Sequence, residues 1–402
     1  MKLLILGANP ETIPLIQVAK DMGVYTIATD FNPHAPAKKI ADKSYNVDGM
    51  DVKGLVELAQ LEKVDGVLVG VADLLVPPYQ KVCEHLNLPC YANQKSINAL
   101  ANKFFFKRVC EAHGVLGVPE FPIHNVVFPV LVKPVDNCSG QGISICYSQK
   151  DLVDAVGEAN KMSRSGRSII ERYMTCDDVL LYYTFKDGEC YLSATADRNT
   201  CPTEKGSLVN LGSTYPSKHT NLYLNCVHDK MKKMFRHLEI ENGVLLIQAF
   251  VEDGKFYVYD PGFRLQGEAP HLLLNAISGF DHRKMLINFA LTSEMKDDCF
   301  PSQNDCFLKG KYAATLWILL KAGKIKVIEG MDINDSRVVH VVQRLQVGDT
   351  ITPNMVGTEK QVFVRFYLVC DSKIELEEFS QYLRNKVKIV GDSGEDLVQM
   401  PS

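Results

Sequence analysis

A lysine followed by a loop of small residues is the first feature of the sequence that could perform chemistry. Lys133 follows the apolar run 130–132, and the loop Asn137-Cys-Ser-Gly-Gln-Gly142 comes shortly after it. The backbone N–H groups of such a loop can approach phosphate oxygens, and the lysine adds a positive charge. The pattern favours a clamp for nucleotide phosphates, although a simple β-turn with two glycines has the same composition.

Two side chains with oxygen atoms are predicted to face each other across a hairpin. The sequence Glu252-Asp-Gly254 separates two β-rich runs, and Gln248 and Asp260 lie six positions on either side of Gly254. Across an antiparallel pair of strands these side chains would be neighbours. Their oxygens could bind Mg²⁺, which usually takes one or two carboxylates plus substrate phosphates. An aspartate before Pro-Gly is also a common turn residue, so that interpretation stays open.

Acidic and basic residues near the loop suggest further contacts. A predicted strand over 168–171 ends in Glu171 and leads to Asp178. The backbone at the strand end could hydrogen-bond an adenine, and the carboxylate of Asp178 could bind a ribose hydroxyl. Alternatively, Glu171 and Asp178 are simply exposed residues near a strand end. The spacing of apolar residues predicts one helix over 96–113, with Ser96 as its N-cap and with Lys103 and Lys107 on one face. Either this face is a basic stripe exposed to solvent, or its Lys103 binds a phosphate group.

The elements that must position these residues fall into three parts. Strands alternate with helices over 1–95, which predicts a parallel sheet. Gly7 follows the first strand, but the GxGxxG fingerprint of dinucleotide-binding folds is absent, so a tight turn is favoured over a cofactor site there. A crevice for a small substrate near Val71-Ala-Asp73 stays open. Hairpins dominate the middle of the chain, and the part from about 306 is a β-rich accessory region after a polar linker over 292–306.

Length and composition limit the number of domains, the partners and the cellular compartment to be expected. A chain of 402 residues suggests two or three domains. A net charge of −4 and a pI near 6.2 give no electrostatic footprint for nucleic acid or an anionic membrane, so neither is expected as a partner. The twelve cysteines show no zinc spacing and are expected to be reduced thiols of a cytoplasmic protein. The first residues are predicted to form a strand and not a signal peptide, and no apolar run is long enough to span a membrane.

Taken in order, these stretches resemble the ATP-grasp enzymes, in the branch with biotin carboxylase and the carbamoyl-phosphate synthetase large subunit. The resemblance covers roughly 1–305. It rests on Asn102-Lys103, on 128–133 and the loop 139–142, on Ile169-Ile-Glu-Arg-Tyr173 with Asp178, and on Tyr259-Asp-Pro-Gly-Phe-Arg264. It implies an α/β fold with an N-terminal Rossmann-like pre-ATP-grasp domain (1–95), a two-lobed α+β ATP-grasp domain (96–305) and a C-terminal β-rich α+β domain (306–402).

The resemblance also implies a role for each matching residue. The protein would be a Mg·ATP-dependent ligase that joins a small carboxylate to an amine through an acyl-phosphate. Mn²⁺ would be an alternative metal, and the resemblance leaves open whether the protein is a homodimer. Arg264 and Lys133 would be catalytic, with Arg264 facing the acyl-phosphate, and Gln248 and Asp260 would bind the metal. The residues that would contact ATP are Lys103, Lys133, Ser139, Gly140, Gln141, Gly142, Glu171, Arg172, Tyr173, Met174 and Asp178. The substrate pocket would include the N-terminal strand ends, Arg198, Lys205, Tyr215 and Arg264.

Three departures from the family pattern leave alternatives open. Gln248, Asp260 and Gly262 stand where the family usually has Glu, Glu and Asn. The chain could hold one Mg²⁺ firmly, borrow Glu268 as a ligand, or have lost catalysis and act as a nucleotide-binding protein. An NAD-linked oxidoreductase is disfavoured because the dinucleotide fingerprint is missing.

Overall fold

The N-terminal part of the chain is a parallel sheet with helices, as the sequence predicts. The structure is a computed structural model that describes residues 1–137, 141–202, 208–301 and 305–400. The strands pair in the order β3-β2-β1-β4, all parallel. The apolar run of β1 is almost wholly buried, which suits a sheet covered on both faces. The elements here are β1 (Lys2–Leu6), α1 (Ile13–Asp21), β2 (Tyr25–Thr29), β3 (Lys43–Tyr45), α2 (Val52–Glu62), β4 (Gly66–Val69) and α3 (Val76–Leu86), with the short 3₁₀ helices η1 (Pro10–Thr12), η2 (Pro36–Lys39) and η3 (Asp73–Leu75).

A break in the chain corrects the prediction of one helix over 96–113. Two helices form instead, α4 (Gln94–Leu100) and α5 (Lys103–Ala112). Asn93, not Ser96, caps α4, and Ser96 completes a capping box at the third helical position. The side chain of Asn102 accepts hydrogen bonds from the backbone at the start of α5. The break therefore sets Lys103 at the first position of a new helix.

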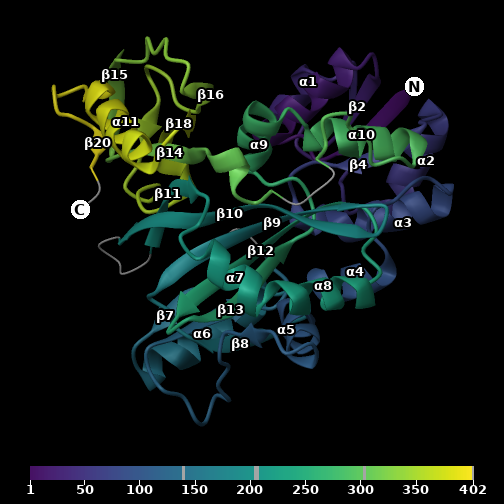
Figure 1. Ribbon diagram of the computed structural model, residues 1–402, viewed down its shortest axis with the longest axis horizontal. Helices are drawn as coiled ribbons and strands as arrows, with labels where there is room; N and C mark the ends of the chain where they lie inside the picture. Colours follow the sequence, from purple (N-terminus) through teal and green to yellow (C-terminus); the bar gives the residue numbers. More distant parts are fainter. Residues whose placement is uncertain (138–140, 203–207, 302–304, 401–402) are drawn as a thin grey trace.

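A small lobe carries the lysine and the loop that follows it. Its sheet has the order β7-β6-β8, with α6 packed on it, and it encloses a hydrophobic cluster of its own that includes Val132, Leu152 and Ile170. Figure 1 shows this lobe below the long central strands. Lys133 is the fourth residue of β6. The elements are β6 (Val130–Pro134), β7 (Ser144–Cys146), α6 (Gln149–Met162) and β8 (Ser168–Arg172).

A long, mostly antiparallel sheet crosses the centre of the molecule. Its strand order is β16-β18-β14-β11-β10-β9-β12-β13-β5. The two Asp-Gly turns predicted from the sequence are confirmed, since Lys186 pairs with Glu189 and Glu252 with Lys255. The central elements are β5 (Leu116–Gly117), β9 (Asp177–Lys186), β10 (Glu189–Pro202), β11 (Leu208–Tyr215), β12 (Gly243–Glu252) and β13 (Lys255–Gly262), and the helices α7 (Thr220–Cys226) and α8 (His228–His237).

The C-terminal part extends this sheet. β14 pairs with β11, so the sheet continues across 305/306, and the division into 1–95, 96–305 and 306–402 stays a prediction. A separate hydrophobic cluster lies beneath α11 and includes Leu316, Phe363 and Leu383. The elements are β14 (Tyr312–Leu320), β15 (Gly323–Glu329), β16 (Val338–Gln343), β17 (Thr350–Ile351), β18 (Val362–Cys370), α11 (Lys373–Lys386), β19 (Lys388–Gly391) and β20 (Val398–Gln399), with short 3₁₀ helices at η4 (Leu308–Gly310) and η5 (Glu359–Gln361).

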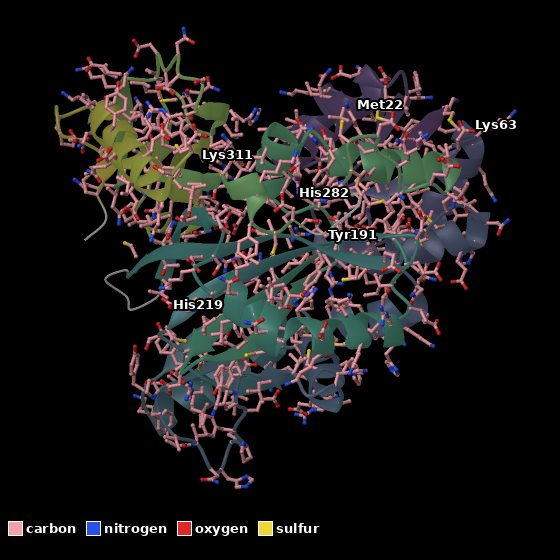
Figure 2. All side chains as sticks on the ribbon, viewed as in Figure 1. Met22, Lys63, Tyr191, His219, His282 and Lys311 are labelled. Carbon is pink, nitrogen blue, oxygen red and sulfur yellow. The ribbon has the colours of Figure 1, made fainter. Side chains whose placement is uncertain are left out.

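One of two helices that follow the central strands returns to the N-terminal sheet, while the other packs on β14, β16 and β18. α9 (Pro270–Ser278) and α10 (His282–Thr292) follow the central strands, and α10 packs on β1, β4 and α1 (Figure 1). The backbone of Ala290 comes so close to Gly66 that a Cβ on that glycine would lie 2.3 Å from the Ala290 carbonyl oxygen. His282, labelled in Figure 2, lies at the start of α10. Its Nε2 is within hydrogen-bond distance of the Thr184 hydroxyl in β9. The N-terminal and central parts consequently share one hydrophobic core.

In the segment predicted as a polar linker over 292–306, Met295 and Cys306 are buried in the same core. Within the part of the chain that the structure describes, no helix is long and apolar enough to cross a membrane.

Candidate functional site

A buried carboxylate joins two lysines between α5 and the small lobe. Glu171 lies 2.7 Å from the Nζ of Lys133 and 2.9 Å from the Nζ of Lys107. Lys107 also pairs with Glu120 at 2.6 Å and is 1% exposed, so the interpretation of its face as a solvated basic stripe is wrong. Burial alone would raise the pKa of Glu171, but the two lysines hold it below its usual value. The carboxylate is therefore ionised and fixes Lys133 in place.

Lys103 connects the loop after β6 to the central hairpin. Its Nζ donates to the backbone oxygen of Asn137 at 2.9 Å and pairs with the carboxylate of Asp260, also at 2.9 Å. These two contacts bring the predicted phosphate lysine and the predicted metal ligand to one place. Ser139 and Gly140 of the same loop lie outside the described residues, whereas Gln141 and Gly142 lie inside them.

A β-bulge determines which side chain stands opposite Gln248. Glu252 pairs with Lys255 across a two-residue turn, and this register alone would place Tyr259 opposite Gln248. The register shifts by one residue between Gln248 and Ala249, so the partner of Gln248 is Asp260, as predicted. Bulges near active sites commonly redirect a side chain in this way.

Tyr259, the extra residue of the bulge, belongs to a polar cluster around Asp178. Its hydroxyl donates to the Asp178 carboxylate at 3.0 Å, and its ring lies 5.8 Å from the Nζ of Lys133. Burial raises the pKa of Asp178, although Arg198 and Tyr259 work in the opposite direction. Asp178, expected to meet a ribose, is thus a buried carboxyl with protein partners on one side. Sequence reasoning missed Tyr259, whose only signal is its place beside Asp260.

Arg198 of β10 reaches the same cluster from the neighbouring strand. Its guanidinium donates to Gln248 Oε1 at 3.1 Å, to Asp178 at 3.2 Å and to Glu268 at 3.3 Å. It also lies 3.1 Å from the hydroxyl of Tyr259. The sequence placed Arg198 in a substrate pocket but gave no sign that it bridges these groups.

Arg264 ties the hairpin to the N-terminal part of the chain. One of its terminal nitrogens pairs with Asp73 of η3, and the other donates to Gln266 at 2.9 Å. Its Nε is buried and has no hydrogen-bond partner within the described residues. The structure therefore leaves one guanidinium donor available beside the site.

The segment after Glu171 connects the small lobe to the central sheet. Arg172 pairs with Glu252 and donates to the Met174 sulfur at 2.8 Å, and Met174 is buried. The backbone N–H of Tyr173 donates to Pro129 at 3.3 Å. These contacts fix the strand end that was predicted to line an adenine.

A cavity lies between this cluster and the N-terminal part. Its polar lining includes Lys103, Asp260 and Asp73, and its apolar lining includes Val76, Leu100 and Phe263. A cavity lined by both charged and apolar side chains suits a small molecule that carries a polar reacting group.

Few side-chain oxygens among the described residues of this site are suited to bind a divalent metal ion. The described residues contain no group of three or more His, Cys, Asp or Glu side chains that could hold a metal ion. Asp260 offers one carboxylate, and this fits Mg²⁺ when nucleotide phosphates supply the other ligands. Gln248 offers a neutral amide oxygen that already accepts a hydrogen bond from Arg198.

The architecture is that of the ATP-grasp fold, as the sequence predicted. The chain is similar to an L-amino acid ligase from Bacillus licheniformis, with a TM-score of 0.80 and 17% identity over 97% of this chain and 98% of that one. It is also similar to the biotin carboxylase domain of the Hydrogenobacter thermophilus 2-oxoglutarate carboxylase in complex with MgADP, ADP and bicarbonate. That likeness has a TM-score of 0.76 and 17% identity, and it covers 99% of this chain and 91% of that one.

Sequence comparison gives a shorter match. The chain is 25% identical over 198 residues to the formate-dependent phosphoribosylglycinamide formyltransferase of Bacillus subtilis. The match covers 46% of this chain and spans about half the length of that relative, 51%. No protein-family model matches the chain.

Proposed function

We propose that the chain is a Mg·ATP-dependent ligase that joins a small carboxylate to an amine through an acyl-phosphate. The observation that supports this proposal most is the 2.9 Å contact between Lys103, which we propose binds phosphate, and Asp260, which we propose binds the metal. The ATP-grasp architecture and the names of similar proteins support it. Phosphoryl transfer needs positioning and positive charge more than covalent participation by the protein, and these residues supply both.

Each residue would have a separate task. Mg·ATP, when bound, supplies the phosphoryl group that activates the substrate carboxylate. Lys103 and Lys133 would neutralise its phosphate oxygens, and the loop that contains Gln141 and Gly142 would cover them. Asp260 would anchor the metal, with Gln248 as a second candidate ligand and Mn²⁺ as an alternative ion. The Nε of Arg264, which has no hydrogen-bond partner in the described part of the chain, would donate to an oxygen of the activated carboxylate.

The remaining assignments follow the same proposal. Residues 171–174, at the end of β8 and just after it, would line the adenine, and Asp178 would meet the ribose. The carboxylate and the amine would bind in the cavity lined by Asp73 and Asp260. The apolar side chains that line this cavity would help to keep water from the activated carboxylate. We also propose a cytoplasmic protein, supported by the buried thiols of Cys83, Cys110 and Cys146, which form no disulfide. We also propose that the chain forms a homodimer.

The test is the substitution Asp260→Asn. We expect ADP formation from Mg·ATP, in the presence of mixed carboxylates and amines, to fall by at least about a hundredfold because the anchoring carboxylate of the metal is lost. Nucleotide binding by calorimetry should persist, since Lys103 and Lys133 still contact the phosphates. Asp253→Asn is the matched control, because Asp253 is exposed at the turn of the same hairpin. Normal ADP formation by Asp260→Asn would show that this hairpin does not hold the metal.

A further inference from the structure

The guanidinium of Arg198 lies where several oxygen atoms converge. One terminal nitrogen is 3.1 Å from Gln248 Oε1 and 3.2 Å from Asp178 Oδ2, and the other is 3.3 Å from Glu268 Oε1. Arg198 is only 16% exposed at its side chain. A single positive charge therefore sits among two carboxylates and an amide oxygen with little water to screen it.

The carboxylate of Glu268 accepts from three protein donors. Besides Arg198, its Oε1 accepts from Asn210 at 3.2 Å, and its Oε2 accepts from Ser213 at 3.4 Å. A metal ion that borrowed Glu268 Oε1 as a ligand would compete with Arg198 and Asn210 for that oxygen. The structure thus uses Glu268 to hold the arginine.

A divalent ion at Gln248 would compete directly with Arg198. Mg²⁺ binds oxygen at about 2.1 Å, so an ion on Gln248 Oε1 would lie within a few ångströms of the guanidinium. The neutral amide offers no charge to offset the repulsion between the two cations. Asp260, by contrast, offers a carboxylate, and its protein contact is with Lys103, the lysine that we propose binds phosphate.

We propose that Arg198 takes the place of a second metal ion, so that the chain binds one divalent ion with its nucleotide, at Asp260, and Gln248 positions Arg198. This inference rests on the proposed function. The Nε of Arg198 is buried and has no hydrogen-bond partner among the described residues, so one donor is left for an oxygen of the ligand. An arginine stays charged at every physiological pH, so it supplies this positive charge whether or not a metal is bound.

The test counts metal ions and does not depend on turnover. The full chain is saturated with one equivalent of a non-hydrolysable ATP analogue and titrated with Mn²⁺, and bound ions are counted from the loss of the electron paramagnetic resonance signal of free Mn²⁺. We expect one bound Mn²⁺ in the wild type. We also expect one in Gln248→Glu, because the new carboxylate would pair with Arg198.

The double variant Arg198→Met/Gln248→Glu should bind two Mn²⁺ ions, because the arginine is gone and three carboxylates, those of Asp178 and Glu268 and the one introduced at position 248, face the vacated position. Arg108→Met is the control, since Arg108 is about half exposed on the outer face of α5, and it should bind one ion.

Two ions in the wild type, or a second ion in Gln248→Glu alone, would overturn the inference even if the double variant did not fold. Failure of the wild type to bind the analogue would overturn the proposed function and this inference together, whereas two ions with the analogue bound would overturn the inference alone.

Discussion

At the scale of single residues, the charged groups expected to contact a nucleotide are already paired with one another. Lys133 is 4% exposed and is held by Glu171, while Lys103 is held by Asp260. Such pairs keep each charge compensated in the absence of a ligand. They also mean that removing one partner affects folding as well as binding, because it leaves the other charge buried without its partner.

Lys133→Met tests this coupling. We expect it to lower the free energy of unfolding by about 3 kcal/mol, because Glu171 would then keep only Lys107 as a buried partner. Adding Glu171→Gln should recover part of the loss, since Lys107 retains Glu120. Urea unfolding of the wild type, both single variants and the double variant gives the coupling energy. If the losses in free energy of unfolding of the two single variants add up to the loss of the double variant, the ion pair has no coupling energy.

At the scale of elements, the pairing of β11 with β14 connects the central strands to the C-terminal part, and the two backbones come very close at one point of this pairing. Gly212 of β11 has φ +108°, and a Cβ at this position would lie 1.7 Å from the carbonyl oxygen of Thr315 in β14. Both the backbone conformation and the space therefore require glycine at this point.

Gly212→Ala should consequently destabilise the protein by more than about 2 kcal/mol, as the strands must separate to admit the methyl group. Gly254→Ala is the matched control, because Gly254 also has a positive φ, +71°, but nothing lies within 4 Å of its added Cβ. The control should cost about 1 kcal/mol from backbone strain alone. Equal thermal unfolding of the two variants would mean that the β11–β14 contact is not needed for stability.

At the scale of the whole molecule, buried histidines lie where α9 and α10 meet the central sheet. His271 and His282 are 6% and 5% exposed, and His282 Nε2 is 2.6 Å from the Thr184 hydroxyl. Burial, helped by the charge of Arg283, lowers the pKa of His271 to about 3. Burial also lowers the pKa of His282 to about 4, although Asp281 works in the opposite direction. Both imidazoles are therefore neutral in the folded protein near neutral pH.

Stability is expected to fall as the solution becomes acidic. The unfolded chain, with histidine pKa values near 6.5, binds more protons than the folded chain below that pH. The contribution of the neutral imidazoles is thus complete above about pH 6.5 and is lost as the pH falls toward the folded pKa values. Between pH 6.5 and pH 5 we expect a loss of roughly 2 kcal/mol for each histidine.

Urea unfolding at a series of pH values measures this loss. The variant His271→Gln/His282→Gln should show a flatter dependence on pH between 5 and 6.5, and His34→Gln, at an exposed position, should match the wild type. A double variant with the slope of the wild type would assign the acid sensitivity to other groups.

The sequence by itself determined the features that depend on neighbours along the chain. The Asp-Gly turns set two hairpins, the apolar runs set β1, β2 and β4, and the resemblance carried by short motifs gave the ATP-grasp fold. Local signals suffice for these features because turn geometry and side-chain periodicity act over a few residues. The pairing of Gln248 with Asp260 was also predicted, although the bulge at Tyr259 that produces it was not.

Only the tertiary structure decided which charges meet. Lys107 and Glu171 are 64 positions apart and Asp73 and Arg264 are 191 apart, so no local pattern shows that they pair. The break before Lys103 likewise became visible only in the folded chain, where the backbone N–H of Lys103 donates to the Val135 carbonyl oxygen. A lysine on a helix looks the same in the sequence whether its face meets water or a buried carboxylate. The difference arises from packing, because burial makes an ion pair necessary where water would otherwise solvate the charge.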